Sequence, residues 1–163
     1  MVGQMAPRSL LSAAVVCALA LAACSGSGDD QRESEVSVGR IVQSWRQDSH
    51  LSLETLTGLV ARNHPVLVVD AAQRTALRSR APDLDWSQVA GADLATSILV
   101  VGGYDNCMAA SRVDFAPKEK ALRFRVSRDK KVNCAWAPYT VDVWAIPRSD
   151  LGGLEPAEMQ VIS

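Results

Sequence analysis

Apolar and polar positions in the second half of the chain follow patterns that are typical of β-strands. Over residues 122–127 they alternate, with Arg123 and Arg125 on the polar face, which predicts a strand buried on one face only. Residues 97–101 are a continuous apolar run, which predicts a strand buried on both faces. Shorter runs predict further strands at residues 39–46, 66–69, 109–115 and 140–146. This order predicts a mainly β (α+β) fold, a small antiparallel sandwich or barrel-like domain with a short helix.

The segment before the strand at residues 66–69 permits two interpretations. Four apolar residues have the spacing of one helix face: Leu53, Leu56, Leu59 and Val60. However, Asn63-His64-Pro65 is a turn signal that directly precedes the strand, and it favours a β-hairpin. We favour the hairpin, with residues 55–61 as the partner strand.

The remaining segments are interpreted as one helix, one turn and two irregular stretches. Asp70 is a suitable N-cap for a short helix at residues 71–78. Residues 83–95 are expected to be a connection that covers the core edge, and Gly102-Gly103 a turn. Residues 149–163 are expected to be a loosely held tail.

The N-terminus has the pattern of an export signal. Arg8 precedes an apolar run that ends at Ala23, shorter than the roughly 20 residues that a membrane-spanning helix needs. The run ends in Leu21-Ala22-Ala23-Cys24, followed by Ser and Gly, and this resembles the lipobox of bacterial lipoproteins. The resemblance implies cleavage after residue 23 and diacylation of Cys24, which would hold the protein on the extracytoplasmic face of a cell membrane. An ordinary secretory signal with an incidental cysteine is the alternative.

This signal sets the expected domain boundaries. Residues 1–23 are the predicted lipoprotein signal peptide, and residues 24–40 the lipidated cysteine and a flexible linker. Residues 41–150 are the predicted β-rich domain, and residues 151–163 the C-terminal tail.

The cysteines predict one disulfide bond. Cys17 would leave with the signal peptide and Cys24 would carry lipid, so Cys107 and Cys134 remain. In an oxidising compartment these two are expected to pair with each other. A redox or metal site is the alternative, but the CxxC spacing is absent and no histidine follows His64.

The composition argues against several classes of function. With 163 residues, 48% of them hydrophobic, the chain is long enough for one domain with a proper core. A net charge of -1 argues against a nucleic-acid partner. Two histidines, His50 and His64, rule out a histidine-rich metal site, and both are expected at the surface. Asp83 and Asp85 are interpreted as turn formers, so no catalytic residue, metal or cofactor is predicted.

Two groups of residues are candidate partner contacts. Arg123 and Arg125, with further basic residues close in sequence, could meet an acidic partner or anionic lipid headgroups, or they could simply be solvated. The neighbouring basic residues are Arg112, Arg128, Lys130 and Lys131. Trp136, Tyr139 and Trp144 crowd the C-terminal part of the chain. If the valines of the last strand face the core, Trp144 is partly exposed and is the best single contact candidate; core packing is the alternative.

The C-terminal region also resembles a known family. Its motifs are Ile98-Leu99-Val100-Val101 followed by Gly102-Gly103-Tyr104, a hairpin over residues 112–128, and a last strand from Ala137 to Arg148. This resembles the C-terminal domain of the PrcB protease-complex subunit family, small β domains of exported bacterial proteins. The resemblance implies an accessory subunit rather than an enzyme.

These observations predict a membrane-anchored, non-catalytic module that binds another exported protein, such as a protease. The alternatives are a small exported hydrolase with an unrecognised site and a purely structural envelope protein.

Overall fold

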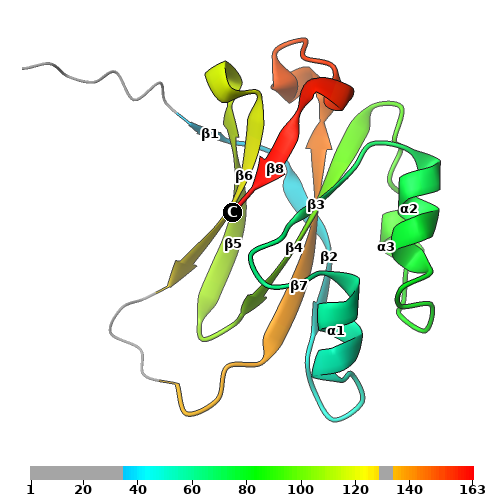
Figure 1. Cartoon of the computed structure of the whole chain (residues 1–163), viewed down its shortest axis with the longest axis vertical. Helices are drawn as coiled ribbons and strands as arrows, with labels where there is room; N and C mark the ends of the chain where they lie inside the picture. The colour runs from blue at the N-terminus through cyan, green and yellow to red at the C-terminus, as the bar shows by residue number, and fades with distance from the viewer. Residues whose placement is uncertain (1–34, 129–133) are drawn as a thin grey trace, which may run out of the picture. The chain divides into compact units, whose positions relative to one another are not determined.

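The computed structural model describes residues 35–128 and 134–163, which lie in one compact unit, Gln31–Ser163. Within these residues the chain forms two four-stranded sheets (Figure 1). The outer sheet, in the order β1-β5-β6-β8, consists of β1 (Val36–Ser37), β5 (Ala109–Ala116), β6 (Ala121–Arg128) and β8 (Gln160–Ile162). The central sheet, in the order β2-β7-β4-β3, consists of β2 (Arg40–Arg46), β7 (Tyr139–Pro147), β4 (Ser97–Asp105) and β3 (Val66–Val68). The predicted mainly β sandwich is confirmed, and neither sheet closes into a barrel.

Three helices and three 3₁₀ turns lie between the described strands. The helices are α1 (Leu53–Leu59), α2 (Ala71–Arg78) and α3 (Ser87–Ala90). The 3₁₀ turns are η1 (Pro117–Glu119), η2 (Arg148–Leu151) and η3 (Pro156–Glu158). The helices pack on the face of the central sheet that points away from the outer sheet (Figure 1). The domain therefore has three layers, and the central sheet is covered on both faces.

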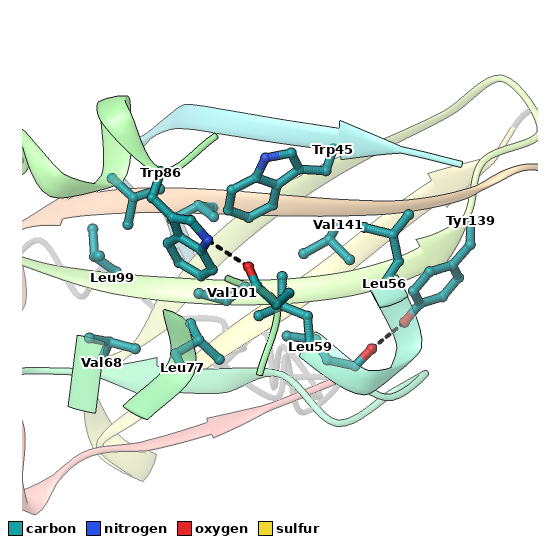
Figure 2. Close-up of a cluster of buried hydrophobic side chains, with 14 residues drawn as sticks. Trp45, Leu56, Leu59, Val68, Leu77, Trp86, Leu99, Val101, Tyr139 and Val141 are labelled. Carbon is teal, nitrogen blue, oxygen red and sulfur yellow. Dashed lines mark hydrogen bonds between the residues drawn. The ribbon is translucent and has the colours of Figure 1, made fainter. Parts of the chain in front are cut away.

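The alternation along β4 and β7 divides the apolar side chains between two cores. Leu99 and Val143 point toward the helices, where the tilted rings of Trp45 and Trp86 pack with their centroids 4.9 Å apart (Figure 2). Val100 and Ile146 point toward the outer sheet. The prediction that residues 97–101 are buried on both faces is confirmed. Because β7 pairs with β4 along its whole length, it is buried in the same way.

The expected turn at Gly102-Gly103 is wrong. β4 continues through both glycines to Asp105. A Cβ at Gly102 would collide with the ring of Phe124 in the outer sheet. A Cβ at Gly103 would collide with the hydroxyl of Tyr139 on the opposite face. The glycines are required because an aromatic side chain crosses the strand on each face.

Residues 53–59 form α1, so the expected hairpin at residues 55–61 is wrong. Ser52 caps this helix and accepts a hydrogen bond from the backbone N–H of Thr55 (3.1 Å). Leu56 and Leu59 are fully buried against the central sheet. The helix is favoured because it places both leucines on one face and leaves the turn signal to form a short connection to β3. The predicted helix at residues 71–78 is confirmed, with Asp70 accepting from the backbone N–H of Gln73 (2.8 Å).

The C-terminal segment is packed rather than loosely held. β8 pairs in parallel with β6, and Leu151 and Met159 are buried in the core between the sheets. The connection at residues 83–95 also contains α3, whose Val89 is buried together with Trp86. Both segments were difficult to predict because each is too short to show a period of its own.

Candidate binding surface

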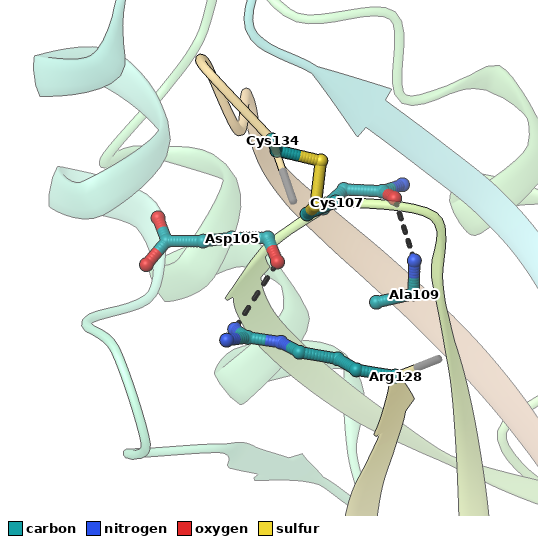
Figure 3. The surroundings of a disulfide bond; sticks show 6 residues. Asp105, Cys107, Ala109, Arg128 and Cys134 are labelled. Atoms are coloured by element: carbon teal, nitrogen blue, oxygen red, sulfur yellow. Dashed lines mark hydrogen bonds between the residues drawn. A yellow bond between two sulfur atoms is a disulfide. The ribbon is translucent and has the colours of Figure 1, made fainter. Parts of the chain in front are cut away.

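The disulfide predicted from the cysteine count is present and joins two connections at one end of the sandwich (Figure 3). Cys107 lies between β4 and β5, and Cys134 lies between β6 and β7. Each connection carries the chain from one sheet to the other. The two Cα atoms are 5.9 Å apart. We call residues 106–108 and 134–138, the described part of the two connections, the tip.

Two large apolar side chains are exposed at the tip. Trp136 is 62% exposed and Met108 is 76% exposed. Met108 also has a φ of 53°, a left-handed conformation that is uncommon for a residue with a side chain. The chain has eight aromatic residues, all within the described part, and the seven others are at least nine-tenths buried. Trp136 is therefore the one aromatic side chain that the fold leaves in water.

The base of the tip is held by hydrogen bonds and an ion pair. Arg128 donates to the backbone carbonyl of Asp105 (3.2 Å) (Figure 3). Arg62 pairs with the Asp105 carboxylate (3.0 Å). The Arg62 guanidinium also lies 5.2 Å from the centre of the Tyr139 ring. Tyr139 donates its hydroxyl to the carbonyl of Val60 (2.7 Å), and burial raises the pKa of Tyr139 to about 12 (Figure 2). These contacts fix the ends of the strands that flank the tip.

Trp144, the contact candidate predicted from the sequence, is 8% exposed and lies between the two sheets. Its indole N–H donates to the hydroxyl of Ser111 (3.0 Å), which donates to the carboxylate of Asp142 (2.5 Å). Tyr104 and Ser44 donate to the same carboxylate at 2.9 and 2.6 Å. Core packing, the other interpretation of Trp144, is confirmed, and the contact candidate is corrected to a core residue, because the valine face and the tryptophan face of β7 are both covered.

This buried network joins the two sheets through hydrogen bonds. Three hydroxyl groups satisfy the Asp142 carboxylate, and Ser111 reaches it from the opposite sheet. The indole N–H of Trp144 donates to the Ser111 hydroxyl, so Ser111 both donates and accepts a hydrogen bond within the sandwich. Burial and the neighbouring Asp142 charge raise the pKa of Tyr104 well above its usual range.

Arg123 and Arg125 lie on the solvent face of the outer sheet, where carboxylates neutralise them. Glu35 pairs with Arg123 (3.1 Å) and with Arg125 (2.8 Å). Glu119 pairs with Arg123, and Asp114, which is 3% exposed, pairs with Arg112 (2.9 Å). The hydrogen bond from Arg125 is the main cause that lowers the pKa of Glu35. Three arginines thus share three carboxylates, and this face offers an acidic partner little free positive charge.

The other singled-out residues show no site in the part of the chain that the structure describes. His50, His64, Asp83 and Asp85 are exposed. The backbone N–H of Ser87 lowers the pKa of Asp85, as in an ordinary turn. Over residues 35–128 and 134–163, no group of three histidine, cysteine or acidic side chains could hold a metal ion. Cys24, the predicted signal peptide, Lys130 and Lys131 lie outside the described residues.

No helix in the described residues is long and apolar enough to cross a membrane.

Trp136 is the functional candidate that sequence reasoning passed over in favour of Trp144. A signal for it was present, because Trp136 lies between Cys134 and Pro138, where no alternating pattern indicates a strand. Residues in such connections are normally at the surface. Nothing in the sequence marked Met108.

Comparisons with protein-family models, with curated proteins and with solved structures find no match to this chain.

Proposed function

We propose that the protein is a lipid-anchored, non-catalytic binding module on the extracytoplasmic face of a membrane, and that the tip contacts its partner. The single observation that carries the binding site is the exposure of Trp136 and Met108 on two disulfide-joined connections. Exposed tryptophan and methionine are enriched at protein interfaces, and a rigid base lowers the entropy lost on binding. The lipobox at Cys24 supports the anchor, and the PrcB resemblance supports an exported partner such as a protease.

The position of the linker favours a protein partner over the membrane surface. The first described strand, β1, pairs with β5 at Phe115, whereas the tip begins before Ala109 (Figure 1). Six residues of strand separate these points, or about 20 Å. Glu35, where the chain enters the domain, is also clamped by Arg123 and Arg125. The chain therefore enters the described domain at the end of β5 that is opposite the tip, which leaves the tip free for a protein partner.

The test is site-specific photocross-linking in full-length protein expressed in its native host. A photoreactive phenylalanine derivative replaces Trp136 or Met108, and the matched control replaces Val36, which is 56% exposed at the linker end. We expect both tip positions to cross-link one exported protein and the Val36 position not to do so. Equal yields at all three positions, or cross-links to lipid alone, would contradict a protein-binding tip.

The anchor is tested separately with Cys24→Ala. We expect this variant to leave the membrane fraction while its folded domain remains intact. Unchanged membrane retention would refute lipidation without affecting the result for the tip.

A further inference from the structure

β2 presents an open sheet edge. One side of β2 pairs with β7, and no backbone or side-chain group of the described residues bonds to its other side. The other described edge strands are β1, β3 and β8, which have two or three residues each, whereas β2 has seven. A long open edge offers unpaired N–H and C=O groups to another extended chain.

A groove borders the first half of β2. Its volume is about 770 Å³, and its lining includes Gly39–Val42, Gly91–Asp93 and the turn residues Ser149 and Asp150. Ile41, on the wall that β2 provides, is 44% exposed. Ser97 of β4 and Ala145 and Pro147 of β7 also line it, so the groove extends over the end of the central sheet and adjoins the N-terminal end of β2.

The charges of β2 indicate which segment would fit. Arg40 and Arg46 stand at its two ends, and neither makes a hydrogen bond or ion pair within residues 35–128 and 134–163. Arg112, Arg123 and Arg125 on the outer sheet are instead all ion-paired. β2 therefore carries two unneutralised positive charges about 20 Å apart and no carboxylate.

Arg40 and Arg46 lie on opposite faces of the central sheet. The register of β2 against β7 shifts between Ile41 and Gln43, so Arg40 is opposite Ala145 and Arg46 is opposite Thr140. An added strand would therefore meet one positive charge on each face, and the edge is complementary to an acidic strand.

We propose that the outer edge of β2 is a docking site for an extended acidic peptide segment of a partner protein, which adds to the central sheet as a fifth strand. Main-chain hydrogen bonds would supply affinity, and carboxylates opposite Arg40 and Arg46 would set specificity and orientation. The site is separate from the tip and does not depend on it.

The experiment screens a displayed library of random nine-residue peptides against the full-length protein in detergent micelles. The expected result is enrichment of acidic, β-branched peptides. Synthetic copies should slow amide hydrogen exchange in β2, and N-methylation of alternate residues should weaken their binding at least tenfold. Arg40→Glu with Arg46→Glu should reverse the selection toward basic peptides. Arg78→Glu on α2, the matched control, should leave it unchanged.

Each result decides the proposal. Selected peptides without an acidic preference, or with protection that maps away from β2, would overturn it. Insensitivity to N-methylation would overturn strand addition in particular. Trp136→Ser should not affect peptide binding, so failure here and failure at the tip are distinguishable.

Discussion

The central sheet and the tip place their aromatic residues in opposite environments, although β7 joins them directly. In the central sheet, Trp144 is buried and its indole N–H is hydrogen-bonded to Ser111. At the tip, Trp136 is exposed on a connection that a disulfide restrains. A large aromatic residue stabilises the fold where other layers cover it. It is available for contact with a partner where nothing covers it. The sequence around each tryptophan therefore says less about its role than the layer in which it lies.

Polar groups show the same contrast. Asp142 is buried in the sandwich and three hydroxyl groups satisfy it, whereas Arg40 and Arg46 on the edge strand make no hydrogen bond or ion pair among the described residues. The outer edge of β2 also offers backbone groups that no described residue pairs with. This difference is why the two binding proposals lie at the tip and at the sheet edge rather than between the sheets.

Gly103→Ala is expected to have the largest effect, because it breaks the central sheet. The new Cβ would collide with the Tyr139 hydroxyl, whose bond to Val60 would also be disturbed. Overpacking and a lost buried hydrogen bond together predict a loss of about 3–5 kcal/mol in unfolding free energy. Urea denaturation measures this loss in unfolding free energy.

Gly58→Ala is the matched control, since a Cβ at Gly58 in α1 meets nothing within 4 Å. It should be neutral or stabilise by up to about 1 kcal/mol. Similar values for the two variants would show that β4 and Tyr139 are not in the described contact.

Removal of the disulfide is expected to have the next largest effect. The bond closes a loop with a sequence separation of 27, so Cys107→Ser with Cys134→Ser should lower the unfolding free energy by about 3–4 kcal/mol. In the folded variant, faster amide exchange should be confined to residues near the tip. Uniformly faster exchange throughout the central sheet would contradict the separation of the two regions.

The two buried tyrosines should make the unfolding free energy depend on pH in the alkaline range and not near neutral pH. The chain has two tyrosines, and burial raises the pKa of Tyr104 and sets that of Tyr139 at about 12. Because these values exceed the ordinary value of 10.0, the stability that the protonated hydroxyls provide is complete below about pH 10 and falls as pH rises toward about 12.

The near-ultraviolet absorbance of phenolate measures this ionisation. At about pH 11 the folded protein should show little phenolate, and urea-unfolded protein should show that both tyrosines are largely ionised. Substantial ionisation in the folded state would mean that the Tyr139 hydroxyl is not enclosed by α1 and the central sheet.

The sequence by itself determined several features that depend on local pattern. The alternation over residues 122–127, the apolar run at residues 97–101 and the Asp70 cap all correspond to elements in the structure. The pairing of Cys107 with Cys134 also followed from the count of available thiols. These features are readable because each depends on neighbours in the chain or on a single possible partner.

Only the tertiary structure decided which surfaces are free. The second sheet buries Trp144, the crossing aromatic rings turn Gly102-Gly103 into strand, and Glu35 neutralises arginines far along the sequence. Exposure of Trp136 and the open edge of β2 are likewise set by what the other layers do not cover. Whether a surface is buried by another layer depends on segments that are far apart in the sequence, because they meet only when the sheets pack together.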